Sequence, residues 1–230
     1  MKVSLNWLND YIDLKDIPVN DIAHKLTMTG LEVEEVINEN EIYKGFIVAH
    51  VTEKVKHPNA DKLSICKVNT GSEELQVICG APNVEAGQKV VFAPIGTLIP
   101  NGGFLIKKAK IRGVESNGMI CAEDEINLSD DHSGIMVLPA EMKAGTPITE
   151  ALGLNDVIME VAITPNRPDA LSHFGVARDL AAIYNREFRY PQISINEASE
   201  ETKDFASVEI MDAVNCPRYS ARIVKYVEIK

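Results

Sequence analysis

The chain has 230 residues, of which 45% are hydrophobic and 25% charged, and its formal net charge is -11. This length suits one or two globular domains, and no apolar run approaches the roughly 18 residues that a membrane-spanning helix needs. The acidic balance argues against general affinity for nucleic acids, because a basic surface is their usual electrostatic signature.

The first forty residues predict two short helices. Ser4 can cap a helix over residues 5–12, in which Leu5, Leu8 and Ile12 share one face. Pro18 introduces a second helix, and Gly30 is its natural end. The opening segment is therefore expected to be helical.

From residue 31 the hydrophobic period changes to two, which is typical of strands. The alternating runs are separated by turn formers and cover residues 31–37, 46–55, 63–69, 75–81, 89–95 and 104–114. Many short strands within about 100 residues, with no long helix between them, indicate a small sandwich or barrel. Five or six strands favour a barrel of the oligonucleotide-binding type.

The last third mixes both periods. A strand is expected over residues 156–163 and a helix over 173–185, capped by Ser172. After a polar linker, alternation predicts further strands over residues 192–196, 206–214 and 219–230. Because the final run stops with no turn or cap, we expect this chain to be the front of a longer protein.

The fold class expected from these elements is α+β, with an oligonucleotide-binding-type β-barrel inserted into a small discontinuous α/β domain. The helical segments 1–40 and 145–195 are each too small to bury a core alone, so they are expected to pack together as the host domain. The barrel would occupy residues 41–144. Residues 205–230 would begin a further, truncated domain.

Enzyme motifs are scarce in this sequence. There is no phosphate-binding loop motif, no GxGxxG after a strand and no HExxH, and neither a catalytic residue nor a metal ligand is expected. The segment "SDDHSG" indicates a polar turn rather than a catalytic triad, and "CAEDEI" a solvated acidic patch. The four cysteines show no CxxC pairing, which is typical of buried free thiols in a reducing cytoplasm.

Charge is unevenly distributed along the middle of the chain. Residues 44–112 carry ten Lys and Arg against five Asp and Glu, whereas residues 113–141 carry seven Asp and Glu and no Lys or Arg. Alternation places Lys108, Lys110 and Arg112 on one strand face, where three cations can follow a phosphate backbone. Solvated loops of opposite sign remain the alternative reading.

A second group of polar residues precedes them. Lys54, Lys56 and Lys62 can extend the cationic face across a shallow groove, and His57 and Asn59 are available to stack on or hydrogen-bond with unpaired bases. Equally, the "HPNAD" segment can be a turn whose residues only shape the loop.

Three motifs, "HPNADKL", "VICGAPN" and "KAKIRGVESNGMICA", resemble the tRNA-binding module of the oligonucleotide-barrel type. Further motifs, "GLEVEEV", "SDDHSGI" and "ITPNRPDALSHFGVARDLAAI", are similar to the beginning of bacterial phenylalanine–tRNA ligase β subunits. The resemblance runs from "SLNWL" to "CPRYSARIV", nearly the whole chain.

The resemblance implies a cytoplasmic α2β2 enzyme that joins phenylalanine to tRNA using ATP and Mg²⁺. In that family the aminoacylation centre lies in the α subunit, and the β subunit adds tRNA contacts and an editing domain. This chain would hold neither catalytic centre, bind no cofactor itself, and end within the first strands of the editing domain. The positions that match the module as RNA-face or loop-shaping residues are His57, Asn59, Lys62, Lys110, Arg112, Ser116 and Gly118.

Two other functions are also compatible with the sequence. A free-standing tRNA chaperone would explain the barrel but not the flanking helices. A protein-interaction scaffold would use the barrel for subunit contacts, and the net charge of -11 suits that role.

Overall fold

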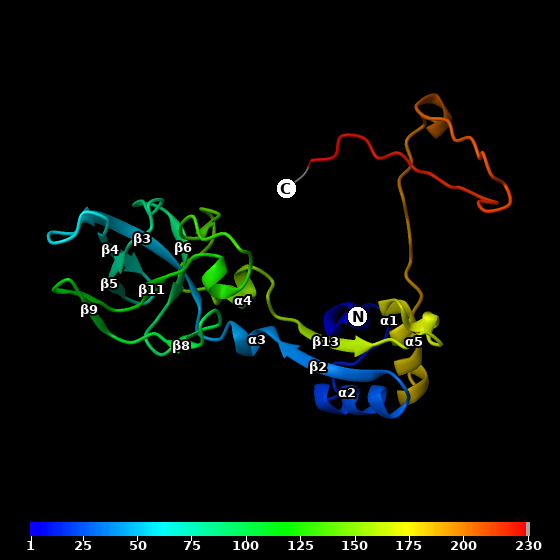
Figure 1. Ribbon diagram of the computed structural model, residues 1–230, viewed down its shortest axis with the longest axis horizontal. Helices are drawn as coiled ribbons and strands as arrows, with labels where there is room; N and C mark the ends of the chain where they lie inside the picture. Colours follow the sequence, from blue (N-terminus) through cyan, green and yellow to red (C-terminus); the bar gives the residue numbers. More distant parts are fainter. Residues whose placement is uncertain (229–230) are drawn as a thin grey trace. The chain divides into compact units, whose positions relative to one another are not determined.

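Strands from both ends of the first unit form one small sheet. The structure, a computed structural model, describes residues 1–228 (Figure 1), and the chain divides into two units after Tyr190. Lys2–Ser4 (β1), Val157–Ala162 (β13) and Glu32–Asn38 (β2) pair antiparallel in the order β1-β13-β2. The central strand of this sheet thus lies more than 100 residues from both of its neighbours.

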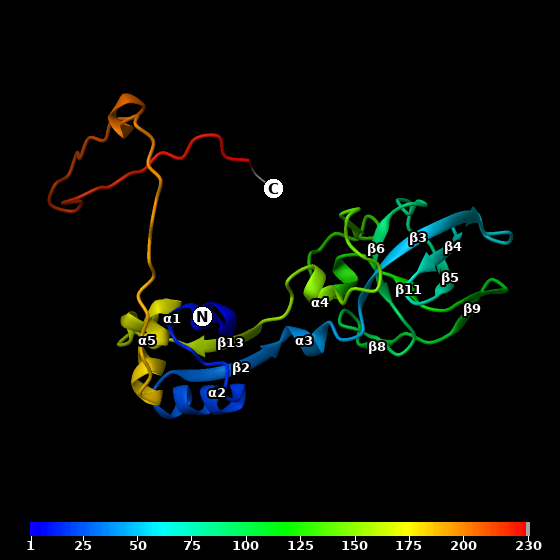
Figure 2. The ribbon, with the colours of Figure 1, turned by 180° about the vertical axis from the view of Figure 1, so that it is seen from behind.

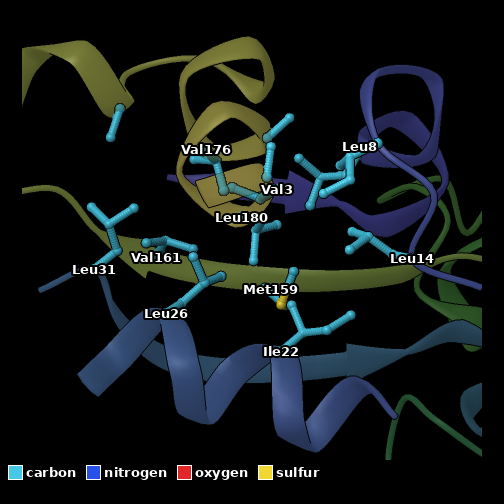
Figure 3. Packing of buried hydrophobic residues seen from close by; sticks show 14 residues of the cluster. Val3, Leu8, Leu14, Ile22, Leu26, Leu31, Met159, Val161, Val176 and Leu180 are labelled. Carbon is cyan, nitrogen blue, oxygen red and sulfur yellow. The ribbon is translucent and has the colours of Figure 1, made fainter. Parts of the chain in front are cut away.

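Three helices cover the sheet: Leu5–Tyr11 (α1), Val19–Met28 (α2) and His173–Tyr184 (α5). In Figure 3, α2 lies on one side of the sheet, and α1 and α5 lie on the other. The hydroxyl of Ser4 accepts a hydrogen bond from the backbone N–H of Trp7, and that of Ser172 accepts one from Gly175. Both predicted helix caps are therefore confirmed.

One hydrophobic core joins the beginning of the chain to residues 159–181 (Figure 3). Its largest fully buried side chains are Leu8, Ile12, Leu14, Ile22, Leu26, Leu31 and Met159. Burying a side chain of this size contributes about 1.5–3 kcal/mol, so the core depends on residues from both segments.

Residues between β2 and β13 build the predicted barrel. Its sheet is antiparallel, with the order β11-β6-β3-β4-β5 and β12 also paired to β6. The strands are Ile47–Lys56 (β3), Ser64–Asn69 (β4), Glu74–Cys79 (β5), Lys89–Ala93 (β6), Met119–Ile120 (β11) and Val137–Leu138 (β12). Two further buried clusters fill its interior, one around Phe46 and one around Phe92.

Short elements complete the barrel and its junctions. Two hairpins pair Leu98–Ile99 (β7) with Phe104–Leu105 (β8) and Ala109–Ile111 (β9) with Val114–Ser116 (β10). The short helices are Glu39–Ile42 (α3), Asp124–Ile126 (η1), Ile148–Ala151 (α4) and Pro168–Ala170 (η2).

The expected single strand over residues 104–114 is wrong. The segment forms β8, an irregular stretch and β9, and then turns back at Arg112 and Gly113, whose φ angles are +49° and +94°. Ile111 pairs directly with Val114, so this is a two-residue hairpin turn of the kind that needs positive φ at both positions. Arg112 therefore lies in a turn and not on a strand face.

The second unit differs from the sequence expectation too. Within residues 191–228 the only regular element is the short helix Thr202–Asp204 (η3), and the strands expected over 192–196, 206–214 and 219–228 do not form. Alternation favours a strand only where a neighbouring strand supplies hydrogen bonds, and side chains such as Val214 are 89% exposed here. Residues 229 and 230 lie outside the described residues.

Candidate nucleic-acid interface

His57 joins the loop after β3 to the β9–β10 turn. Its side chain is only 2% exposed. Nδ1 accepts a hydrogen bond from the backbone N–H of Asn59 at 3.0 Å, and Nε2 lies 3.2 Å from the carbonyl oxygen of Ile111. Because Nδ1 accepts and a carbonyl can only accept, the ring carries its proton on Nε2.

Asn59 adds a second link between the same two segments. Its side-chain Nδ2 donates to the carbonyl oxygen of Arg112 at 3.3 Å. We call these contacts of His57 and Asn59 the clasp. The clasp holds the loop over residues 57–63 against the β9–β10 turn, and Figures 1 and 2 both show these segments at the same end of the barrel.

The clasp corrects one expectation about the loop. His57 is buried, so its ring face is not available to stack on an unpaired base. The backbone contacts made by His57 and Asn59 favour the other reading of "HPNAD", in which these residues shape the loop.

Three of the predicted cations form ion pairs. Lys54 lies 2.8 Å from a carboxylate oxygen of Glu85, and Lys108 lies 3.0 Å from one of Glu115. Lys56 lies 2.8 Å from a carboxylate oxygen of Asp61, and both side chains are more than two-thirds exposed. Exposed pairs of this kind are worth about 0–1 kcal/mol, so a phosphate can displace Asp61 at little cost.

The remaining predicted cations are exposed and have no ion-pair partner within residues 1–228; they are Lys62, Lys110 and Arg112. Together with Lys56 they form what we call the basic surface. The clasp positions its two halves, because Lys62 belongs to the 57–63 loop and Arg112 to the turn that the loop contacts.

Ser116 and Gly118 serve the closure of the barrel. Ser116 is 3% exposed, and its Oγ accepts from the backbone N–H of Ile78 at 3.0 Å and donates to the carbonyl oxygen of Gly118 at 3.2 Å. A Cβ at Gly118 would lie 2.2 Å from Cζ of Phe92. Ser116 is thus buried against β5, and the half-buried Gly118 lies close to Phe92 of β6, which fits a structural role at both matched positions.

The acidic segment that follows is tied into local turns. A carboxylate oxygen of Glu125 accepts from the backbone N–H of Ala122 at 2.7 Å. His132 Nδ1 lies 2.7 Å from Oδ2 of Asp124, so its hydrogen-bond partner is neither Asp131 nor Ser133. The adjacent residues of "SDDHSG" therefore do not form a triad. Instead, the carboxylate of Asp131 accepts from the Ser133 N–H, a contact that lowers the pKa of Asp131.

Two hollows share residues 80–82 in their linings. The first, the lysine groove, measures about 570 Å³ and is lined by Lys54, Lys56, Lys62 and Asp61 among others. The second, the apolar cleft, measures about 560 Å³ and has Phe104, Lys107, Glu125 and His132 in its lining. Sequence reasoning did not select Phe104, Lys107 or His132 as site residues, because neither their exposure nor their proximity has a local signal.

The thiols offer no activated nucleophile. Cys66, Cys79 and Cys121 are buried and unpaired, and burial raises the pKa of Cys66 to about 11. Cys216 is exposed, contrary to the expectation of buried thiols, because it lies in the sparsely packed second unit. Among the described residues, no group of three or more metal-ligating side chains converges, and no helix is long and apolar enough to cross a membrane.

The barrel matches a known family of domains. A family model described as "Putative tRNA binding domain" matches residues 46–147, a span that runs from just before β3 to just before α4. The barrel is therefore similar to a family of tRNA-binding domains, as its motifs predict.

Curated relatives align with this chain along its whole length. Proteins named phenylalanine–tRNA ligase beta subunit are 46% identical in Fusobacterium nucleatum, 43% in Syntrophus aciditrophicus and 45% in Bacillus subtilis. Each alignment includes 100% of this chain but only 28–29% of the relative. The chain is thus related, along its entire length, to the N-terminal part of the bacterial phenylalanine–tRNA ligase β subunit, and it spans less than a third of that subunit's length.

Proposed function

We propose that the barrel binds tRNA through the basic surface, and that the chain acts as the N-terminal region of a phenylalanine–tRNA ligase β subunit. The observation that carries this proposal is the clasp, which holds the 57–63 loop against the β9–β10 turn and so groups cations from both segments. The match of residues 46–147 to a tRNA-binding family supports the choice of ligand.

The arrangement of charge explains how an acidic chain can bind a polyanion. Contacts with phosphates depend on the local potential, and cations without a carboxylate partner do not have to break an ion pair before binding. Lys62, Lys110 and Arg112 meet that condition within the described residues. Of the ten matched or predicted positions, these three are the ones to which we assign phosphate contacts, with Lys56 as a displaceable fourth.

In the complete ligase this region would work beside an α subunit, in an α2β2 assembly of the cytoplasm that uses ATP and Mg²⁺. The names of the relatives support an α partner and the ligase reaction. We assign no catalytic step to this chain. Purified chain is expected to give no phenylalanine-dependent exchange of pyrophosphate into ATP, and exchange that copurifies with the chain would refute that assignment.

The decisive experiment measures tRNA affinity over a salt series. The triple variant Lys62→Gln, Lys110→Gln, Arg112→Asn removes the charges, and Asn keeps the positive φ that the turn requires. Losing three phosphate contacts should reduce the slope of log K against log salt by about two to three, from about 0.7–0.9 per contact.

The matched control replaces three lysines outside the barrel, in the first 30 residues of the same unit: Lys2→Gln, Lys15→Gln and Lys25→Gln. Binding by this control should remain close to wild type. Equal losses from both triple variants would mean that net charge, and no defined surface, governs binding. The barrel would then be better explained as a contact surface for a protein partner.

A further inference from the structure

The apolar cleft beside the basic surface has the character of a ligand site. Its volume of about 560 Å³ lies within the roughly 300–1,000 Å³ of pockets that hold small organic groups. Its lining includes Ile78, Ile111 and Ile120 together with a few polar and charged side chains. A largely apolar cleft of this size can hold a planar ring.

Two aromatic rings are exposed in the lining. Phe104 is 49% exposed, which is unusual for a phenylalanine and leaves part of its ring free to be covered. The His132 side chain is 77% exposed, yet its Nδ1 is fixed by Asp124 at 2.7 Å. Since a carboxylate oxygen accepts, Nδ1 carries the proton, and the ring is oriented with Nε2 free.

The lysine groove and the apolar cleft differ in net charge, because lysines outnumber carboxylates only in the groove. The lysine groove has Lys54, Lys56 and Lys62 in its lining, so a phosphate is favoured there. The apolar cleft, which shares residues 80–82 with the groove, is instead lined by one glutamate, Glu125, and one lysine, Lys107. The carboxylate of Glu125 disfavours a phosphate in the cleft and can accept a hydrogen bond from the amino group of a nucleobase.

We propose that the apolar cleft binds one unpaired nucleobase of the RNA, stacked against Phe104 and His132, while the lysine groove holds the adjoining phosphate. This inference rests on the proposed function, which requires only phosphate contacts. It adds that the preferred RNA segment is single-stranded, because a base inside a duplex is covered on both faces and cannot enter the cleft.

The test compares three RNA ligands by fluorescence anisotropy with the 230-residue chain. They are a short single strand, the same strand annealed to its complement, and an abasic copy with identical phosphates. The single strand should bind most tightly. Because stacking of one base on an aromatic side chain is worth about 1–3 kcal/mol, Phe104→Ala should weaken its binding roughly 5- to 150-fold without changing the salt slope.

Two variants make this result specific. Phe104→Tyr keeps a ring and should restore binding. Leu98→Ala is the matched control, because Leu98 pairs with Leu105 in the same hairpin, is 51% exposed and does not line the cleft; it should bind as wild type.

The outcomes separate this inference from the proposed function. If the abasic copy binds as well as the single strand, or Phe104→Ala has no effect, the base site is overturned, even when loss of Lys62, Lys110 and Arg112 still weakens binding. If no RNA binds, the proposed function itself fails. If adenosine monophosphate competes as strongly as the oligomer, the cleft takes free nucleotides and the assignment to RNA is wrong.

Discussion

Replacing His57 by phenylalanine tests whether the clasp organises the basic surface. Phenylalanine keeps a ring in a site that is 2% exposed but removes both hydrogen bonds. Each such hydrogen bond contributes about 0.5–1.5 kcal/mol to stability. Loss of both should therefore lower the free energy of unfolding by about 1–3 kcal/mol. The matched control is His24→Phe, at an exposed position on α2.

Urea denaturation followed by circular dichroism measures the stability change, and tRNA affinity is measured on the same samples. His57→Phe should also weaken tRNA binding, although the ring itself cannot reach the RNA. Its salt slope should stay near the wild-type value, because the cations are still present and only their positions are less fixed. Reduced stability with unchanged affinity would refute the idea that the clasp positions these cations.

Three further predictions concern other parts of the chain. Ellman's reagent should titrate one thiol in the native protein, Cys216, and all four after denaturation; additional native reactivity would show that the barrel cysteines are accessible. Burial lowers the pKa of His173 below 6.5, and its Nε2 accepts from the Ser4 N–H at 2.9 Å, so this contribution to stability is present above pH 6.5 and is lost as pH falls through the folded-state pKa. The single tryptophan, Trp7, stacks on that ring at 4.0 Å, so its fluorescence should change with a midpoint below pH 6.5, and a transition that persists in His173→Gln would contradict this. Replacing residues 41–154 by a short Gly/Ser linker should leave a folded helical remainder, since the side chain of Asn40 hydrogen-bonds the backbone of Asn155 at 3.2 Å; loss of the helical signal would refute the discontinuous-domain hypothesis.

Local sequence signals predicted the three longest helices and every strand of five or more residues. Ser4 and Ser172 cap their helices as expected because a cap needs only a side chain and the next three residues. The run over residues 104–114 was less informative, since its alternation continues through a turn. Only the pairing of Ile111 with Val114 shows where the chain reverses.

The site was harder to predict, because its residues are defined by distant partners. His57 is buried by a contact with Ile111, 54 residues away, and Lys54 is paired with Glu85, 31 residues away. A motif identified His57 as important but could not distinguish a loop-shaping histidine from one that faces RNA. The same holds for Phe104, whose exposure depends on how β7 and β8 pair.

Hydrogen–deuterium exchange of the chain with and without tRNA tests directly whether the barrel binds the RNA. It reports which backbone segments the RNA covers without any substitution. We expect tRNA to slow exchange over residues 56–64 and 106–116, which carry the clasp and the basic surface, and to leave α1, α5 and residues 191–228 unchanged. Protection confined to those last segments, with none in the barrel, would contradict this expectation.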